Sequence, residues 1–272
     1  MPAKRFTAEI EKEIAKRYEN GEGPTELGRI YGIDRSTVRI IAQRNGVYKN
    51  MSESKRKYQL DINFFDNIDT EEKAYWLGFI AADGTIKGEK NTVMDLVLQA
   101  KDVDMLEMLK MHLNYNAPIH KREGVTKNGK QFYARGLRIM DKHVCERLAG
   151  YGIVKRKQST VRIPQGLDKE MIRHFIRGYF DGDGSIGEIL SPGKITPQKV
   201  FSVTGNELMI SDIRGILVNE CDLKANKLKK DNRSKHTYSL HYGGNKQILK
   251  IYEFLYKNAS VFMLRKKLKF ER

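Results

Sequence analysis

Residues 76–84 read WLGFIAADG and residues 175–184 read FIRGYFDGDG, so one short phrase occurs twice in the chain. Each copy is an apolar run that ends in Asp-Gly, and a small hydroxyl residue and an isoleucine follow it. The aspartates at the matching positions, Asp83 and Asp183, are separated by 100 residues. Because solenoid repeats have periods of about 20–50 residues, this longer period predicts a duplicated domain.

The small residues in both copies predict that two helices pack closely against each other. Residues four apart share one face of a helix, which places Gly78 with Ala82 and Gly178 with Gly182. Glycine inside a helix costs about 1 kcal/mol relative to alanine, so its presence needs a packing reason. Small residues at this spacing allow two helix backbones to approach closely. We therefore expect these four residues to form a helix–helix interface.

If the two helices pack in this way, Asp83 and Asp183 emerge side by side at one end. Two carboxylates that close repel each other, and a divalent cation between them relieves the repulsion. A single apolar helix that ends in Asp-Gly is usually only a core helix, but two matched copies favour a functional role. A calcium-binding loop is excluded, because Ile186 stands where that loop requires glycine and Pro192 where it requires glutamate.

These residues resemble a known family. Residues 78–84 and 178–184 look like the two LAGLIDADG motifs of a single-chain homing endonuclease, and the resemblance covers roughly residues 71–272. It implies an α+β fold of two pseudo-symmetric αββαββα repeats, whose four-stranded sheets form a concave saddle that faces DNA. It also implies an enzyme of a mobile genetic element, which acts as a monomer and breaks both strands of DNA at a long, specific site.

Hydrolysis of a phosphodiester needs a positioned water, charge neutralisation at phosphorus and a stabilised leaving oxygen. Two or more Mg²⁺ ions can serve all three needs. Mg²⁺ prefers oxygen ligands from a few carboxylates and from substrate phosphate, which suits Asp83 and Asp183, each aimed at one strand. The resemblance adds the backbone carbonyls of Ala82 and Gly182 as ligands, and Mn²⁺ or Ca²⁺ can replace Mg²⁺ in crystals.

The family also places basic or polar residues near the metal ions. Lys142 and Lys246 are our candidates for this catalytic role, because each begins a helix after the last strand of its repeat. The alternative is that both are ordinary surface lysines at the start of a helix, with no role in catalysis. Asp181 precedes the second motif acid, but its counterpart in the first copy is Ala81, so we do not expect it to be a symmetric catalytic group.

Composition narrows the class of partner. The chain has 272 residues, with 50 Lys and Arg against 34 Asp and Glu, a net charge of +16. Such an excess favours a polyanion, either nucleic acid or an acidic membrane surface. No apolar run is long enough to span a membrane, no signal peptide opens the chain, and two distant cysteines indicate neither disulfides nor zinc. We expect an intracellular protein of the cytoplasm or nucleoid.

The chain divides into four expected segments: a helix-turn-helix domain at residues 1–50, a basic linker at 51–70, and repeats at 71–160 and 161–272. In the first segment, Pro24 suits the first position of a helix and Asp34 suits the N-cap of the next. A glycine-containing turn joins these two helices. This segment resembles the helix-turn-helix domains of resolvases and transposase-like proteins.

The helix after the turn carries the polar and basic side chains that would enter a DNA groove. They are Arg35, Ser36, Thr37, Arg39, Gln43 and Arg44. The alternative is a three-helix bundle with a solvated basic face. We favour DNA binding, because the polar residues lie on the helix that would enter the groove.

The two repeats have the same predicted order of elements. The first has strands at 85–87 and 92–100, a helix at 103–113 capped by Asp102, strands at 118–125 and 131–140, and a helix at 142–151. The second has a motif helix from 169, strands at 185–189 and 199–204, a helix at 206–218, strands at 227–231 and 237–242, and a helix at 246–256. Basic triplets at 155–157 and 265–267 also correspond.

Basic residues recur along the predicted strands. Charge runs are usually solvated, but alternating basic side chains on a hairpin can share one sheet face, and such a ribbon fits the major groove. As a group, the candidates for DNA contact are Lys87, Arg122, Lys130, Arg135, Arg138, Lys227, Lys229, Lys230, Arg233 and Lys235.

Two other function classes stay open on the sequence alone. A DNA-binding regulator could keep the fold without cutting, although an inactive copy has no chemical need for both motif acids. An intron maturase could bind RNA with the same saddle, and salt-dependent binding to duplex DNA or to folded RNA would separate the two. We do not expect an intein, because the chain starts Met1-Pro2 and ends Glu271-Arg272, without the residues that splicing requires.

Overall fold

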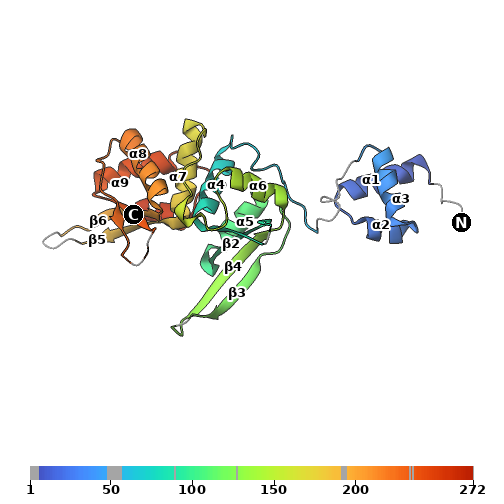
Figure 1. The fold of residues 1–272 in the computed structure, drawn as a ribbon, viewed down its shortest axis with the longest axis horizontal. Coiled ribbons are helices and arrows are strands. Elements are labelled where there is room, and N and C mark those ends of the chain that lie inside the picture. The colour runs from blue at the N-terminus through green and yellow to red at the C-terminus, as the bar shows by residue number, and fades with distance from the viewer. Residues whose placement is uncertain are drawn as a thin grey trace. The chain divides into compact units, whose positions relative to one another are not determined.

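The computed structural model describes residues 6–47, 57–88, 90–126, 128–190, 195–232, 234 and 236–271. They form two compact units (Figure 1). The first extends to Leu60 and includes Asn114–Ala117, and the second includes Asp61–Leu113 and the chain from Pro118 onward. Among the described residues, no helix has the length and apolar character needed to cross a membrane.

The first unit contains three short helices, α1 (Ala8–Glu19), α2 (Pro24–Tyr31) and α3 (Arg35–Arg44). Pro24 occupies the first turn of α2, and Gly32 ends that helix in the left-handed conformation with φ 66°. Asp34 caps α3, because its Oδ1 accepts a hydrogen bond of 2.7 Å from the backbone N–H of Ser36. The core of this unit consists of Ile14, Tyr18, Leu27, Val38, Ile41 and Ala42.

The second unit contains two matching repeats. The first comprises α4 (Glu71–Asp83), β1 (Gly84–Lys87), β2 (Val93–Gln99), a 3-10 turn (Ala100–Asp102), α5 (Val103–His112), β3 (His120–Val125), β4 (Gln131–Ile139), α6 (Lys142–Gly150) and a second 3-10 turn (Lys157–Ser159). The second comprises α7 (Lys169–Asp183), β5 (Gly184–Ile189), β6 (Gln198–Gly205), α8 (Glu207–Cys221), β7 (Lys229–Lys230), β8 (Tyr238–Gly243), α9 (Asn245–Tyr256) and α10 (Leu264–Glu271).

Each repeat forms its own antiparallel four-stranded sheet. The strand orders are β1-β2-β4-β3 and β5-β6-β8-β7, so the second sheet repeats the first strand for strand. Helices cover one face of each sheet, and buried Leu96 and Leu137 point to that face in the first repeat. The predicted α+β fold of two matching repeats is therefore confirmed.

The motif helices α4 and α7 pack directly against each other between the two sheets (Figure 1). A Cβ atom added to Gly78 would lie 2.0 Å from the backbone oxygen of Phe175. A Cβ atom added to Gly178 would lie 1.9 Å from the backbone oxygen of Tyr75. No side chain fits at either place, so the spacing of small residues in the sequence correctly predicted the close approach.

A buried arginine ties the C-terminal segment to both motif helices. Arg177 on α7 is 0% exposed and donates hydrogen bonds to the backbone oxygens of Leu255 and Val261, at 2.9 and 2.8 Å. Its third partner is the carboxylate of Glu71 on α4, at 2.5 Å. A buried charge is tolerated only when it is paired and hydrogen-bonded, and here every partner lies far away in sequence.

Asp181 makes a second buried connection. Its carboxylate accepts hydrogen bonds from Tyr75 Oη, Tyr256 Oη and the backbone N–H of Met263, at 2.8, 2.7 and 2.7 Å. Burial raises the pKa of this carboxyl group, while the three donors oppose the shift. These contacts give Asp181 a structural role, in agreement with its lack of a counterpart in the first copy.

Three local predictions were wrong or incomplete. Asp102 occupies the N-cap position of α5, but its side chain makes no capping hydrogen bond; it is 5% exposed and binds the guanidinium of Arg265 at 2.6 and 2.9 Å. The helix α10 was not predicted, because its basic sequence reads as a solvated run. Lys227 lies before β7, which is limited to Lys229–Lys230 at the sheet edge, where charged side chains are common.

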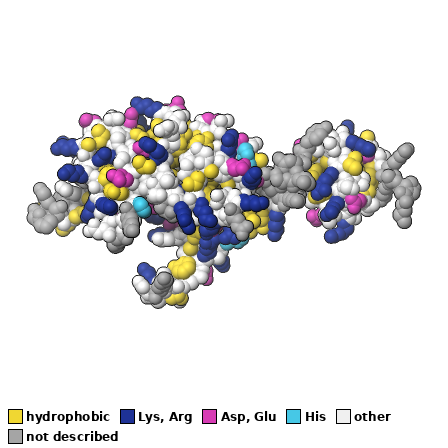
Figure 2. Space-filling view, in the orientation of Figure 1, with side chains coloured by type: hydrophobic (Ala, Val, Ile, Leu, Met, Phe, Trp, Pro, Cys, Tyr) yellow, Lys and Arg dark blue, Asp and Glu magenta, His cyan; other side chains and the backbone are white. Residues whose placement is uncertain are grey.

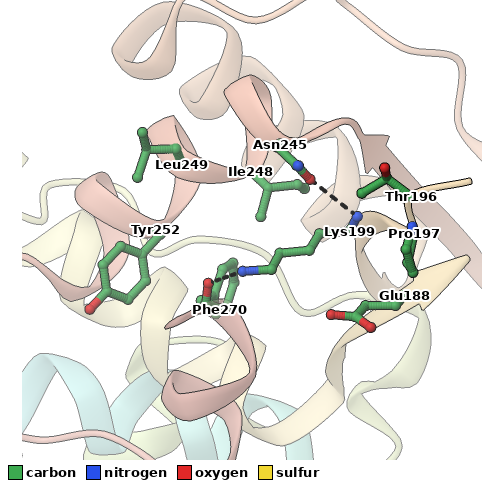
Figure 3. A pocket seen from close by; sticks show the side chains of 9 residues that line it. All are labelled: Glu188, Thr196, Pro197, Lys199, Asn245, Ile248, Leu249, Tyr252 and Phe270. Carbon is green, nitrogen blue, oxygen red and sulfur yellow. Dashed lines mark hydrogen bonds between the residues drawn. The ribbon is translucent and has the colours of Figure 1, made fainter. Parts of the chain in front are cut away.

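The end of α10 is anchored on the second sheet. The Nζ atom of Lys199 on β6 donates a hydrogen bond to the backbone oxygen of Phe270 (Figure 3). Beside it lies a surface hollow of about 430 Å³, lined by residues of β5, β6, α9 and α10 that include Glu188, Leu249 and Tyr252. Neither motif aspartate lines this hollow.

We predict that Gly78→Ala lowers the free energy of unfolding by about 3 kcal/mol or more, because a backbone oxygen cannot move aside for the new methyl group. Trp76, the one tryptophan in the chain, is fully buried on α4, and its fluorescence reports unfolding of this unit in urea. Gly215→Ala on α8 is the control: nothing lies within 4 Å of its added Cβ, so it should gain about 0.5–1 kcal/mol. Equal effects of the two substitutions would contradict the packing account.

Candidate active site

The two motif aspartates lie at the carboxyl ends of the packed helices. Asp83 is the last residue of α4, and Asp183 is the last residue of α7. A Cβ atom added to Gly182 would lie 2.4 Å from the Cβ of Ala82 and 3.2 Å from Oδ2 of Asp83. The acid of the first helix therefore rests against the backbone of the second, next to the second acid.

Both carboxyl groups titrate abnormally. Burial, and then the nearby charge of Asp183, raise the pKa of Asp83 to about 6. Burial also raises the pKa of Asp183, although its side chain reaches the surface more than that of Asp83. The positive charges of Lys157 and Lys266 oppose both shifts. Because both carboxyl groups are difficult to ionise, a cation bound between them would stabilise their charged forms.

Lys157 closes the end of the first motif helix. It is 8% exposed, and its Nζ atom donates hydrogen bonds to the backbone oxygens of Ile80 and Ala82, at 2.5 and 3.2 Å. These oxygens belong to the last turn of α4, where the helix dipole is negative, and the oxygen of Ile80 also accepts the backbone N–H of Gly84. Burial lowers the pKa of Lys157 to about 8, and the two aspartates oppose that shift.

Lys266 does the same for the second motif helix. It is 4% exposed and donates to the backbone oxygens of Phe180, Gly182 and Gly184, at 2.8, 3.2 and 2.7 Å. Burial lowers its pKa to about 8, and the nearby carboxylate of Asp181 opposes the shift most. The site therefore contains two aspartates and two buried lysines in a pseudo-symmetric arrangement.

The structure does not bring Lys142 and Lys246 to this site. Lys142 at the start of α6 has a side chain that is 75% exposed and lies 3.4 Å from Glu146. Lys246 is an exposed residue of α9. Neither is among the charges that act on the two aspartates. The sequence prediction placed them at the correct ends of the repeats but could not tell which way each helix start faces.

The signal for the two buried lysines was present in the sequence. The basic triplets at 155–157 and 265–267 repeat one another, and each supplies one lysine to the site. The structural counterparts are Lys157 and Lys266, so the alignment of the triplets shifts by one residue between repeats.

The donor set suits a hard divalent cation. It offers the carboxylates of Asp83 and Asp183 and the backbone oxygens of Ala82 and Gly182, and Mg²⁺ prefers such oxygen ligands. The two carbonyls each accept a lysine hydrogen bond, but a carbonyl oxygen has two lone pairs and can take a second partner. Among the residues that the structure describes, no group of three or more His, Cys, Asp or Glu could hold a metal. Substrate phosphate and water would supply the remaining oxygen ligands.

The strand register separates the predicted DNA-contact residues of the first sheet. Lys87, Arg122 and Arg138 lie on the face that the helices leave open, together with Asp95. Arg135 points to the other face, where it lies 3.8 Å from Glu123. Lys130 lies in the β3–β4 turn.

In the second sheet, Lys229 and Lys230 are exposed on the edge strand β7 and Lys227 precedes it. Arg233 and Lys235 lie outside the described residues.

The predicted groove-facing residues of the first unit lie on α3. Arg35, Ser36, Arg39, Gln43 and Arg44 are exposed, and Thr37 is half-buried. Ile40, on the same outer face, is an apolar residue that is 47% exposed.

Residues 170–255 match the family model of the LAGLIDADG-like domain. The chain contains a LAGLIDADG-like domain. The match runs from α7 into α9, and the first repeat has the same strand order and its own motif helix.

Two curated proteins of Methanocaldococcus jannaschii share parts of this sequence. The DNA-directed RNA polymerase subunit Rpo1C is 30% identical over 97 residues, and the replication factor C small subunit is 25% identical over 173 residues. These segments are 36% and 60% of this chain but only 10% and 9% of the two proteins. The chain therefore spans about a tenth of each relative.

Solved structures of LAGLIDADG homing endonucleases are similar at low identity. I-SmaMI bound to cleaved DNA is 15% identical, with a TM-score of 0.48 over 73% of this chain and 86% of that chain. I-LtrWI bound to target DNA is 12% identical, with a TM-score of 0.46 over 77% of this chain and 88% of that chain.

The raised pKa of Asp83 predicts a pH-dependent cost to stability in the metal-free protein. The group favours folding while it is protonated, below pH 4, and this contribution is lost as the pH rises through about 6. We expect Asp83→Asn in EDTA to be more stable than the wild type by about 1–2 kcal/mol at pH 7.5, after allowance for partial exposure.

The difference should shrink toward zero near pH 4, because both side chains are then neutral. Urea unfolding at the two pH values measures it. Asp104→Asn on the exposed first turn of α5 controls for the loss of a carboxylate. A stability gain that is the same at both pH values would show that the cost of ionising Asp83 is not the cause.

Proposed function

We propose that this protein is a site-specific DNA endonuclease that makes an Mg²⁺-dependent double-strand break, as a monomer. The observation that carries the proposal is the pair of adjacent aspartates at the ends of two packed helices, each helix closed by a buried lysine. A duplex has two scissile strands, and this centre offers one aspartate and one lysine for each. The LAGLIDADG-like domain supports the same assignment.

In this proposal, Asp83 and Asp183 hold the divalent ions together with the backbone oxygens of Ala82 and Gly182. Bound Mg²⁺ would neutralise phosphate charge and make a coordinated water more acidic. The protein contributes the placement of the four oxygens, which the contact of α4 with α7 fixes before substrate arrives. Preorganised charges of this kind cost no rearrangement during the reaction.

The lysines have a distinct part in the proposed chemistry. The ammonium groups of Lys157 and Lys266 offset the negative charge of the carboxylates. They therefore also reduce the electrostatic repulsion between the site and a phosphate group. A pKa of about 8 leaves each lysine mostly charged at neutral pH yet able to exchange a proton with the site. Their burial keeps both groups within hydrogen-bond distance of the helix ends.

Duplex DNA is the substrate that the charge distribution supports. The net charge of +16 favours a polyanion, and the open face of the first sheet carries Lys87, Arg122 and Arg138. Antiparallel ribbons of this kind fit the major groove. Because one chain supplies both repeats, both halves of the catalytic centre are present in a monomer.

The N-terminal unit would extend recognition beyond the site that the sheets contact. Its support is the exposed row of Ser36, Arg39, Ile40 and Gln43 on α3, at positions that share one helix face. Arginine and glutamine suit base edges, and an apolar side chain suits the methyl group of thymine. Arg35 and Arg44, near the two ends of α3, suit phosphate contacts.

The test uses the DNA locus on the two sides of the gene, joined as it would read if the mobile element that carries the gene were absent. We expect one discrete double-strand cut with wild-type protein and Mg²⁺, and none in EDTA. Asp183→Asn should abolish cutting and leave affinity for the locus within a few-fold, since it removes a metal ligand and not a DNA contact. Asp104→Asn should cut like the wild type.

The outcomes separate the alternatives. Tight binding without any cut would favour a regulator, and a preference for folded RNA would favour a maturase. Cutting in EDTA, or by Asp183→Asn, would contradict the metal role. In the same assay Arg39→Ala should weaken binding by about 5- to 100-fold without preventing the cut, whereas the exposed Lys12→Ala on α1 should have a small effect.

A further inference from the structure

Three basic side chains of the first sheet converge on one buried carboxylate. Asp95 on β2 is 1% exposed. The Nζ of Lys87 lies 2.7 Å from its Oδ2, the Nη2 of Arg122 lies 2.8 Å from Oδ2 and 3.1 Å from Oδ1, and the Nε of Arg138 lies 3.7 Å from Oδ1. We call these four residues the Asp95 cluster.

The Asp95 cluster lies on the sheet face that the helices leave open. Met94 and Leu96, the neighbours of Asp95 along β2, are buried in the core, so Asp95 points the other way. The three cations lie against its carboxylate on this face. Their own side chains are 47%, 33% and 44% exposed for Lys87, Arg122 and Arg138. A ligand on this face would meet the cations and not the carboxylate.

The cluster is also close to the candidate active site. Asp95 pairs in register with Thr85, which is two residues after Asp83. Arg138 on β4 pairs with Asp95 from the other side. Figure 2 shows Lys and Arg side chains gathered beside the base of the β3–β4 hairpin. DNA held with a scissile phosphate at Asp83 would therefore lie across this cluster.

The second sheet has different chemistry at the matching positions. Ser202 takes the place of Asp95, because it pairs with Ser185 and with His241 in the same register. The hydroxyl oxygens of Ser185 and Ser202 lie 2.8 Å apart. Gly187 stands where the first sheet has Lys87. The two halves of the saddle thus differ next to the catalytic centre: one has a fixed group of cations and the other has hydroxyls and an imidazole.

A fixed arginine is a better reader of bases than a free one. An arginine side chain has about 2 kcal/mol of rotamer entropy, and binding costs less when its fork is already held in place. Guanine presents two acceptors in the major groove, which match a guanidinium held at a defined angle. The carboxylate also removes one unit of positive charge from the surface, which weakens indiscriminate attraction to phosphates.

We propose that Asp95 is a positioning residue for DNA recognition: it holds Lys87, Arg122 and Arg138 so that the first repeat selects guanine in the half-site next to the cut. This inference rests on the proposed function. It requires an asymmetric target, in which guanine preference is concentrated in the half that the first repeat contacts.

The test is selection from a randomised duplex of about 30 base pairs, bound by the full chain in EDTA so that no cutting occurs. The Arg138→Ala variant shows which base-pair positions the first repeat contacts: they are the block of positions at which this variant has a weaker base preference than wild type. We expect this block to favour guanine with wild-type protein. Asp95→Asn should lower the preference in the same block by about tenfold. Ser202→Ala, the register-matched control in the second sheet, should leave that block unchanged.

A second readout separates positioning from simple damage to the fold. Asp95→Asn should bind non-specific duplex as tightly as wild type or more tightly, with a steeper dependence on salt, because a negative charge is lost. A damaged protein would bind every sequence less tightly. Asp95→Ser, which copies the residue of the second sheet, provides an independent variant, and thermal unfolding of both variants checks the fold.

The outcomes distinguish this inference from the proposed function. If wild-type protein selects no motif, site-specific recognition itself fails and this inference fails with it. If wild-type protein selects a motif but Asp95→Asn and Asp95→Ser keep the guanine block, the positioning role of Asp95 is wrong and the proposed function stands. An even loss of preference across both half-sites would also overturn the inference.

Discussion

The contact of α4 with α7 is the constraint on which the rest of this structure depends. Because Gly78 and Gly178 have no side chains, the two backbones meet at distances that even a methyl group would not allow. This contact joins two repeats into one unit and brings Asp83 beside Asp183. The arrangement has an electrostatic cost, because burial raises the pKa of both carboxyl groups and the nearby charge of Asp183 raises that of Asp83 further. The helix contact that joins the two repeats therefore also produces a pair of buried carboxyl groups whose charge a bound cation would neutralise.

The protein offsets this cost with charges supplied from distant parts of the chain. Lys157 follows the last helix of the first repeat, and Lys266 lies on the final helix of the second, yet both reach the ends of the motif helices. Arg177 and Asp181 then hold the C-terminal segment in place through buried hydrogen bonds. Each repeat thus supplies a helix, an aspartate and the lysine that closes that helix. An electrostatic cost at a functional site of this kind is tolerated because the surrounding structure compensates for it.

Local patterns predicted most of the fold, and long-range contacts were responsible for what they missed. The repeated phrase predicted the helix pair, alternation predicted the strands to within a few residues, and Asp34 at an N-cap predicted α3. Asp102 was expected to cap α5 but binds Arg265, a partner far away in sequence. Lys142 was named as the catalytic lysine because helix starts are visible in a sequence, whereas the direction of a side chain is not. The Asp95 cluster likewise needed the strand register, which no pattern in one strand defines.

Metal-directed cleavage of the polypeptide tests the central claim most directly. Fe²⁺ bound in place of Mg²⁺, with ascorbate and peroxide, cuts protein backbone close to the metal. With duplex DNA present at low salt, we predict cuts at the carboxyl ends of α4 and α7, near Asp83 and Asp183. Excess Mg²⁺ and the double substitution Asp83→Asn with Asp183→Asn should suppress them. Cuts elsewhere in the chain, or cuts that neither treatment reduces, would contradict the account that the paired aspartates form the metal site.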